Sequence, residues 1–388
     1  MKAEFVDNRF LESPLNPSLS IQRVDVYNTH YIIQHQGNIT ALASSNNGAW
    51  VATGAKDNCV KLLSTPNLRK PSGFVFSNPL SSAISAAPAS ENAGGAPGSG
   101  GSLLKPIMKT FYNHDKPITA LTFHPLLPFL FSAAEDKSIK FFDMTKTNQQ
   151  NCCVAEINDS AIVRSMAFNP SGDFLVVGAE DPILRLYDIN TRVALCDPVL
   201  TDHHHNAIRL VDFASHGRVY ASTCEDGDLK IWDTTINRPV ILADKLFKGR
   251  ALSTMTFSKN GKYILTCPQS YTTDACLYDL RYFNELKPVV TYSHLRSKSD
   301  TAQVDRGSYP ILSFSSDESH VFGSFSVNNT APPSIHLWDT RTGRFIRTME
   351  SGHKGIITAL TSTKDNCNGN WNTIITGSTD NRIRVWFN

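Results

Sequence analysis

The chain has 388 residues, 41% hydrophobic and 10% aromatic, which is enough apolar material for a large buried core. Its 37 basic and 35 acidic residues leave a net charge of +2, so no overall charge favours nucleic acid or a membrane surface. The eight cysteines form no Cys-x-x-Cys pair, which predicts reduced thiols in an intracellular protein. No run approaches 18 apolar residues, so we expect no membrane span.

A segment with the composition of a strand begins soon after the N-terminus. Residues 26–35, VYNTHYIIQH, are rich in β-branched and aromatic residues, as strands typically are. We expect residues 1–25 to be a poorly ordered extension in front of this strand.

Further along the chain one short pattern recurs, a β-type run that ends in an aromatic residue and is usually followed by Asp. The copies are Phe142-Asp143, Tyr187-Asp188, Trp232-Asp233, Tyr278-Asp279, Trp338-Asp339 and Trp386, with a weaker copy ending at Leu63. The first four strong copies lie 45 or 46 residues apart, and the later intervals are 60 and 48 residues. Runs such as ITALTF and SIKFFD lie between them, separated by turn residues.

A second set of residues keeps a fixed distance from these aromatic positions. In three units a His is followed by Ser or Thr after 18 residues, by Asp after four more, and by the aromatic position after another six. The last unit has five extra residues in the first gap. The sets are His35, Thr53, Asp57; His114, Ser132, Asp136; His204, Ser222, Asp226, Trp232; and His353, Thr376, Asp380, Trp386. The third unit keeps the spacing with Asp159, Val177, Asp181 and Tyr187.

This repeat resembles the WD-repeat family, in which each unit contributes four strands to one blade of a propeller. We therefore expect an all-β fold, a seven-bladed WD-repeat β-propeller, with residues 26–388 as one domain. The strand at residues 26–35 is expected to pair with the strand that carries Val385 and Trp386. Such pairing closes the ring and removes two exposed sheet edges.

The His, Ser or Thr, and Asp sets could also be catalytic triads, and the run His203-His204-His205 could be a metal site. No further metal ligand lies at a persuasive spacing, and the sets resemble the structural tetrad of the WD-repeat family. In that tetrad the Asp accepts a hydrogen bond from the His, the hydroxyl contacts the other ring nitrogen, and the Trp N–H completes the chain. We expect no catalytic residue, no metal and no cofactor, and we expect His203 and His205 to be loop residues.

Two segments interrupt the repeats. Residues 66–105 are rich in Ala, Gly, Ser and Pro, which predicts a flexible surface loop, and their glycines match no phosphate-binding motif. Residues 293–308 are polar and charged. They are expected to form a solvated loop, with partner contact as the alternative.

Particular strings narrow the resemblance to one group of propellers, the WD-repeat subunits of the cleavage stimulation factor. The strings are FNPSGDFLVVGAEDPILRLYDINT (168–191), TFYNHDKPITALTFHP (110–125), KSIKFFDMTK (137–146), FSKNGKYIL (257–265) and LWDTRT (337–342). The resemblance covers about residues 27–388, with the insertion at 66–105 as an addition.

That resemblance implies a nuclear, non-enzymatic subunit of the complex that cleaves pre-messenger RNA before polyadenylation. The implied partners are a helical-repeat scaffold subunit, an RNA-recognition subunit and the tail of RNA polymerase II, with RNA bound only indirectly through the complex. Members of that family carry an N-terminal helical homodimerisation domain, whereas about 25 residues precede the closing strand here. Either the chain is a truncated form or self-association through that domain is absent.

Two other function classes are open. Tyr278-Asp279-Leu280-Arg281 and Trp338-Asp339-Thr340-Arg341 resemble paired W-D-x-R boxes, through which some propellers attach to the adaptor of cullin-RING ubiquitin ligases. Arg281 and Arg341 would then be the adaptor contacts, although Arg at this position is also common as a solvent-facing residue. Direct RNA binding is disfavoured, because the near-zero net charge offers little attraction for phosphates.

One surface feature is independent of these resemblances. The residue before the turn Asp is Glu in three successive units, at Glu135, Glu180 and Glu225. In a WD repeat this position lies on the face with the wider mouth of the central channel. We therefore expect the three carboxylates to form an acidic arc that binds a basic partner segment, with a solvated rim as the alternative.

Overall fold

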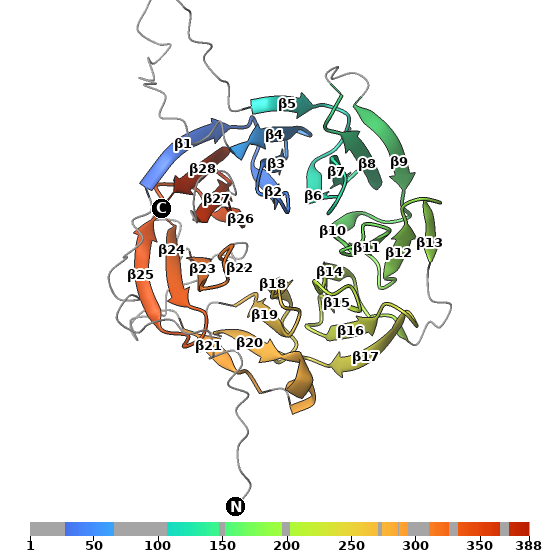
Figure 1. Cartoon of the computed structure of the whole chain (residues 1–388), viewed down its shortest axis with the longest axis vertical. Coiled ribbons are helices and arrows are strands. Elements are labelled where there is room, and N and C mark those ends of the chain that lie inside the picture. The colour runs from blue at the N-terminus through green and yellow to red at the C-terminus, as the bar shows by residue number, and fades with distance from the viewer. Residues whose placement is uncertain are drawn as a thin grey trace, which may run out of the picture.

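The computed structural model describes residues 28–65, 107–146, 152–195, 202–270, 274–285, 287–293, 310–325, 333–364 and 372–387. These residues form seven four-stranded antiparallel sheets, which are arranged as blades around a central channel (Figure 1). The predicted seven-bladed β-propeller is confirmed. The helical element that is described over its whole length is one short 3-10 helix, Leu280–Glu285, and no helix in the described ranges is long and apolar enough to cross a membrane.

The first four blades follow one another in the sequence. Blade 1 contains β2 (Ile39–Ser44), β3 (Trp50–Ala55), β4 (Val60–Ser64) and β5 (Ile107–Phe111). Blade 2 contains β6 (Ile118–Phe123), β7 (Phe129–Ala134), β8 (Ser138–Asp143) and β9 (Cys153–Asn158). Blade 3 contains β10 (Val163–Phe168), β11 (Phe174–Ala179), β12 (Arg185–Asp188) and β13 (Val193–Leu195). Blade 4 contains β14 (Ile208–Phe213), β15 (Val219–Cys224), β16 (Leu229–Asp233) and β17 (Arg238–Ala243).

The remaining three blades complete the ring. Blade 5 contains β18 (Leu252–Phe257), β19 (Tyr263–Pro268), β20 (Ala275–Asp279) and β21 (Val290–Tyr292). Blade 6 contains β22 (Ile311–Phe314), β23 (His320–Phe325), β24 (Ser334–Asp339) and β25 (Phe345–Glu350). Blade 7 contains β26 (Ile357–Lys364), β27 (Asn372–Ser378), β28 (Arg382–Phe387) and, at its outer edge, β1 (Asn28–Gln34).

Blade 7 joins the two ends of the described chain. Its outermost strand, β1, pairs antiparallel with β28, so that Tyr31 lies opposite Val385 and Ile33 opposite Ile383 (Figure 1). The pairing supplies the fourth strand of the last blade from the first strand of the chain. It closes the ring without a free edge between the first and last units.

The hydrophobic core lies between neighbouring blades. Val176 of blade 3, for example, packs in one cluster with Ile208, Tyr220 and Trp232 of blade 4. Successive residues of a strand point to opposite faces of the sheet, so each blade contributes alternate side chains to two such clusters. The contacts are tight, because a Cβ atom on Gly178 would lie 2.5 Å from Cγ2 of Ile208.

Three segments for which the sequence makes predictions lie outside the described residues. They are the extension at residues 1–25, the insertion at 66–105, and the 293–308 insertion except for Ser293.

Candidate functional site

In blades 1 and 2 the predicted His sets form complete hydrogen-bonded clasps between the loop before the blade and its middle strands. His35 lies with Nδ1 2.9 Å from Asp57 Oδ2 and Nε2 2.9 Å from Thr53 Oγ1. His114 makes the equivalent contacts of 2.8 Å with Asp136 and 2.6 Å with Ser132. Each Asp lies in a tight turn just after the second strand of its blade.

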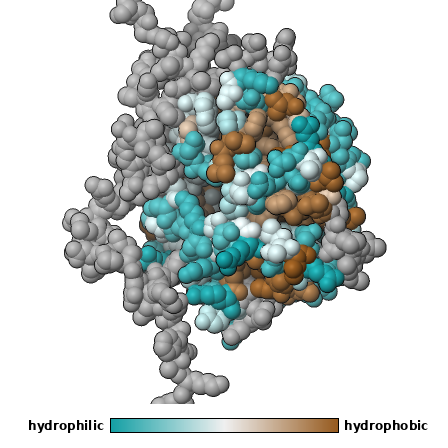
Figure 2. Space-filling model, turned by 45° about the vertical axis from the view of Figure 1, so that its right-hand side comes forward, coloured by the Kyte–Doolittle hydropathy of each residue, from teal (hydrophilic) through white to brown (hydrophobic). Residues whose placement is uncertain are grey.

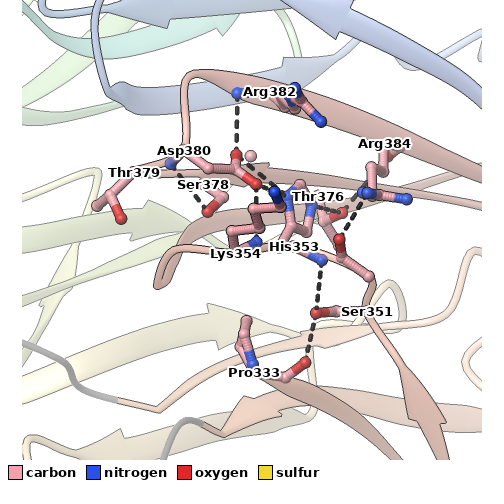
Figure 3. A network of polar contacts seen from close by, with 12 residues as sticks. Pro333, Ser351, His353, Lys354, Thr376, Ser378, Thr379, Asp380, Arg382 and Arg384 are labelled. Atoms are coloured by element: carbon pink, nitrogen blue, oxygen red, sulfur yellow. Dashed lines mark hydrogen bonds and ion pairs between the residues drawn. The ribbon is translucent and has the colours of Figure 1, made fainter. Parts of the chain in front are cut away.

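Blade 7 has the same arrangement (Figure 3), and a tryptophan extends it. Nδ1 of His353 lies 3.0 Å from Asp380 Oδ2, and its Nε2 lies 2.9 Å from Thr376 Oγ1 (Figure 3). Trp386 Nε1 donates to the same hydroxyl at 3.2 Å. Although burial alone would raise its pKa, hydrogen bonds from His353 and from the backbone N–H groups of Lys354 and Arg382 lower the pKa of Asp380 to about 2.

The clasps have the residues of a catalytic triad but not its accessibility. The hydroxyl-bearing residues Thr53, Ser132, Ser222 and Thr376 are each 0% exposed. Burial lowers the pKa of His35 and of His114, more than their aspartate partners raise it. A nucleophile that no substrate can reach has no catalytic use, so these sets hold strands together.

Blade 4 departs from the predicted tetrad. His204 Nε2 lies 2.6 Å from Ser222 Oγ, and Trp232 Nε1 donates to that oxygen at 2.8 Å. Asp226, however, accepts a hydrogen bond from Asn206 Nδ2 at 3.1 Å instead of binding His204. Within the described residues, Nδ1 of His204 has no hydrogen-bond partner. The expected His204–Asp226 bond is therefore wrong, because the loop places Asn206 Nδ2, and not His204 Nδ1, within hydrogen-bond distance of the carboxylate.

The histidines on either side of His204 lie in the loop before β14, as predicted. His205 is exposed, whereas His203 is buried, with a relative exposure of 5%. Burial, together with the positive charge of Lys230, lowers the pKa of His204 to about 3. In the part of the chain that the structure describes, no group of three or more His, Cys, Asp or Glu side chains is arranged to hold a metal.

Blade 3 replaces the histidine clasp with an arginine. Arg185 Nη1 donates to Asp181 Oδ1 at 2.9 Å, and its Nε lies 3.3 Å from Asp159 Oδ1. The other oxygen of Asp159 accepts a hydrogen bond of 2.9 Å from the Tyr187 hydroxyl. The side chains of Asp159 and Arg185 are only 0% and 8% exposed. In blade 3, two aspartates and one guanidinium therefore form the side-chain link that the histidine forms in blades 1, 2 and 7.

Sequence reasoning missed the role of Arg185, although a signal was present. A basic residue stands two positions before the aromatic or Leu position in blades 1, 2, 3, 4 and 7. In blades 2 and 4 this base donates to the carbonyl just before the clasp histidine, as Lys140 does to Asn113 at 2.7 Å and Lys230 to His203 at 2.8 Å.

The three predicted arc residues line one cavity of about 650 Å³ at a mouth of the central channel. Its lining residues come from all seven blades, which places it on the ring axis. Glu135, Glu180 and Glu225 come from the adjacent blades 2, 3 and 4 and lie next to the clasp aspartates. This face of the ring is called the clasp face below.

The mouth is not uniformly acidic, which corrects the prediction of an acidic arc. Arg164 Nη2 forms an ion pair with Glu180, and Arg209 Nη1 lies 3.3 Å from Glu225. Lys56 also lines the cavity. Three bases therefore balance the three carboxylates. Sequence reasoning missed the two arginines, which occupy the second position of the innermost strands β10 and β14.

The two W-D-x-R arginines lie on the opposite face of the ring. Each follows the third strand of its blade, β20 or β24, and blades 5 and 6 are neighbours. Nη2 of Arg281 lies 2.6 Å from Asp279 Oδ2, so this arginine is folded onto its own blade. Arg341 is exposed, and its backbone N–H donates to Asp339 Oδ1 at 3.1 Å.

The outer surface of blades 2, 3 and 4 offers apolar contacts of a different kind. The side of the ring turned forward in Figure 2 shows several hydrophobic patches separated by hydrophilic surface. Exposed apolar side chains on the outer strands of these blades include Val154, Val193 and Leu242. A second cavity, of about 410 Å³, lies between blades 2 and 3 and is lined in part by Leu126 and Phe131.

Comparison with known proteins supports the repeat structure. The family model for the WD domain, G-beta repeat (WD40), matches residues 27–64, 105–143, 151–188, 196–233 and 343–386. Cleavage stimulation factor subunit 50 of Arabidopsis thaliana is 27% identical over 248 residues, which cover 64% of this chain and 52% of that protein. Pre-mRNA-processing factor 17 of Homo sapiens is 23% identical over 284 residues, 72% of this chain and 44% of that protein.

A shorter similarity links the chain to Pre-mRNA-processing factor 19 of Caenorhabditis elegans, which is 26% identical over 127 residues, 33% of this chain and 25% of that protein. The chain spans about half the length of the first two relatives.

Proposed function

Because this chain belongs to the WD40-repeat family, we propose that it is a non-enzymatic protein-interaction subunit of the machinery that processes messenger RNA. The observation that carries the proposal is the cavity at the channel mouth, where charged side chains from blades 1 to 4 face one concave surface. Concave sites with a few convergent polar groups are where proteins bind ligands and peptides. Proteins of this fold serve many functions, so the assignment to messenger RNA processing is argued from sequence similarity and not from the fold.

Within messenger RNA processing, the proposed role is that of the WD-repeat subunit of the cleavage stimulation factor, acting in pre-mRNA 3′-end cleavage and polyadenylation. Support comes from the string at residues 168–191 and from the similarity to the subunit 50 protein of that name. The proposed partners are the helical-repeat scaffold subunit, the RNA-recognition subunit and the tail of RNA polymerase II. The proposed location is the nucleus, with RNA bound only through the complex.

The clasp-face mouth is the proposed partner site, with Glu135, Glu180 and Glu225 among its contact residues. The two arginines beside Glu180 and Glu225 alter the expected ligand. A partner segment that carries isolated charges fits this mouth better than a uniformly basic peptide.

A second candidate function is that of a substrate receptor of a cullin-RING ubiquitin ligase. It is favoured by the position of Arg281 and Arg341, which lie on the same face of two neighbouring blades. The ion pair of Arg281 with Asp279 counts against it, because an adaptor would compete with that carboxylate.

Affinity purification from nuclear extract, followed by mass spectrometry, separates the two functions. We expect polyadenylation subunits in the eluate of the wild-type protein and the same set with the Arg281→Ala/Arg341→Ala variant. A stoichiometric cullin adaptor that is lost in the double variant would instead establish the ligase function. An eluate with splicing proteins and without polyadenylation subunits would keep the role in messenger RNA processing and move it to another complex.

A further inference from the structure

Blades 2, 3 and 4 each have a glutamate at the same position of the repeat, but the residue beside that glutamate differs. The Glu follows the second strand of each blade, and the second residue of the innermost strand lies at a β-bulge beside the end of that second strand. That residue is Arg164 in blade 3 and Arg209 in blade 4, and each pairs with the Glu of its own blade. In blade 2 the same position is Thr119. One of the three glutamates thus lacks the arginine that its two neighbours have.

The two arginine–glutamate pairs are accessible from the channel mouth. The side chains of Arg164 and Glu180 are 41% and 38% exposed, and those of Arg209 and Glu225 are 40% and 49% exposed. All four line the cavity of about 650 Å³, and so do Thr119 and Glu135. These two pairs are examples of an ion pair between a guanidinium and a carboxylate at the channel mouth.

Thr119 differs from the hydroxyl residues at the same position in other blades. Thr40, Ser253 and Thr358 each donate a hydrogen bond to a carbonyl of the next blade, at 2.5, 2.5 and 2.6 Å. Among the residues that the structure describes, the buried Oγ1 of Thr119 has no hydrogen-bond partner. Because that oxygen is buried, it is not open to a ligand, and what Thr119 contributes to the mouth is a short side chain where blades 3 and 4 have an arginine.

The carboxylate beside it has no internal ion-pair partner. Within the described ranges, no basic nitrogen lies within 4.0 Å of the Glu135 carboxylate. The other charges around the mouth are Lys56 on blade 1 and the two paired arginines, which together balance the three carboxylates. Among the described residues, Glu135 is therefore the one carboxylate of the three without an ion-pair partner, and the residue at the arginine position of its blade is a short threonine.

We propose that Glu135 forms a subsite for an arginine side chain of a partner protein, presented on an extended segment that enters the channel mouth over Thr119. The guanidinium would repeat the pairing of Arg164 with Glu180 and of Arg209 with Glu225. Its planar fork of N–H donors can bind both oxygens of a carboxylate at once, whereas a lysine ammonium acts as a single point charge. The subsite rests on the proposed function only in that a partner protein occupies the mouth.

The charge balance of the mouth defines the kind of recognition. With three bases and three carboxylates around the cavity, the mouth exerts little long-range attraction on a basic segment. Selection then depends on hydrogen-bond geometry at one position. We therefore expect a single arginine between uncharged residues to bind, and added basic residues to contribute little.

The test uses the purified protein and the capped tripeptide acetyl-Ser-Arg-Ser-amide, observed by saturation-transfer difference NMR. Matched peptides carry citrulline or lysine in place of arginine. We expect saturable binding of the arginine peptide in the millimolar range, binding weaker by about fivefold or more for lysine, and no saturable binding for citrulline. Equal binding of the citrulline peptide would overturn the proposal, because citrulline has the shape of arginine without the charge.

Three variants locate the site. Glu135→Gln should weaken binding of the arginine peptide by at least about tenfold, as expected for a lost charge-assisted pair. Thr119→Arg should block binding, because the chain then supplies its own guanidinium, as it does in blades 3 and 4. Glu350→Gln is the matched control, since this exposed glutamate lies on the outer strand β25 and does not line the cavity, and binding should remain within about twofold of wild type. Equal losses in Glu135→Gln and Glu350→Gln would show general electrostatic attraction and no subsite.

The same variants separate this inference from the proposed function. If Glu135→Gln retains every partner from nuclear extract and also binds the arginine peptide, the subsite is wrong while the role in messenger RNA processing stands. If the wild-type protein recovers no processing factor, the proposed function fails, and the peptide titration still decides the arginine subsite.

Discussion

Asn206 donates a hydrogen bond of 3.1 Å to Asp226, whereas His204, among the described residues, does not bond that carboxylate. In blades 1, 2 and 7 the equivalent Asp holds the clasp histidine at 2.8 to 3.0 Å. The histidine of blade 4 is therefore fixed from one side only, through Ser222. This difference makes the clasps unequal in stability and in their response to pH.

His114→Ala should destabilise the protein more than His204→Ala. The first change removes bonds to both Asp136 and Ser132, whereas the second removes one bond and leaves Ser222 with its Trp232 donor. A buried group left unpaired costs about 1–3 kcal/mol, so we expect a loss in that range for His114→Ala and less for His204→Ala. Urea unfolding measures both, and a larger loss for His204→Ala would show that the blade 4 clasp is complete in solution.

The lowered pKa of His204 makes the clasp of blade 4 sensitive to acid. Its pKa falls from 6.5 to about 3 in the folded state, so between these values the unfolded chain binds a proton that the folded chain does not. Neutral His204 therefore contributes its full share to the free energy of unfolding above pH 6.5. As the pH falls from 6.5 towards 3, the free energy of unfolding decreases by up to about 1.4 kcal/mol per pH unit.

The matched variant His204→Gln isolates this contribution. It keeps a polar side chain that does not titrate, so its free energy of unfolding should fall less steeply than that of wild type between pH 6.5 and 4. Asp212, whose pKa is raised to about 6 by burial, acts in the opposite direction but is common to both proteins. Parallel curves for the two proteins would mean that His204 is protonated in the fold.

The fold follows from the sequence because period and spacing are repeated. One copy of the aromatic–Asp pattern would fit any strand, but copies at intervals of 45, 45 and 46 residues require a unit that stacks on itself. The pairing of His35 with Asp57 follows in the same way, since equal spacing puts equivalent residues in equivalent places.

The spacing of the repeats could not predict which of several nearby side chains forms a hydrogen bond or an ion pair with a given carboxylate. Spacing puts Asp226 near His204, but it does not reveal that Asp226 accepts its hydrogen bond from Asn206 and not from His204. Likewise, three glutamates in register predict an acidic arc, while the bases that face them lie 16 residues earlier in the sequence, as Arg164 does from Glu180 and Arg209 from Glu225. A charge pattern taken from one position of the repeat therefore leaves out the charges on the neighbouring strand.

The arginine clasp of blade 3 should be the one most damaged by a single substitution. Arg185→Met would leave two aspartates, Asp159 and Asp181, without their cation, and Asp159 is 0% exposed. Breaking a buried ion pair by removing one partner costs about 3–5 kcal/mol. Arg344→Ala, at an exposed position, is the control and should change stability by less than about 0.5 kcal/mol. Urea unfolding of both variants tests this, and similar small losses would show that the aspartates find other partners or bind protons.

Charge reversal at the channel mouth distinguishes the paired from the unpaired glutamates. Glu225→Lys would place an ammonium against Arg209, which now lies 3.3 Å from the Glu225 carboxylate. Glu135→Lys meets no base within ion-pair distance among the described residues. Because the groups are about half exposed, solvent screens the effect, and an exposed pair contributes only about 0–1 kcal/mol.

We therefore expect Glu225→Lys to lower the free energy of unfolding by about 1 kcal/mol, from loss of one attraction and gain of one repulsion. Glu135→Lys should stay within about 0.5 kcal/mol of wild type, and the difference between the two should shrink in high salt. Thermal unfolding at low and high ionic strength measures both quantities. If Glu135→Lys proves the more damaging substitution, Glu135 has a cationic partner within the chain, and a partner's arginine would have to compete with it.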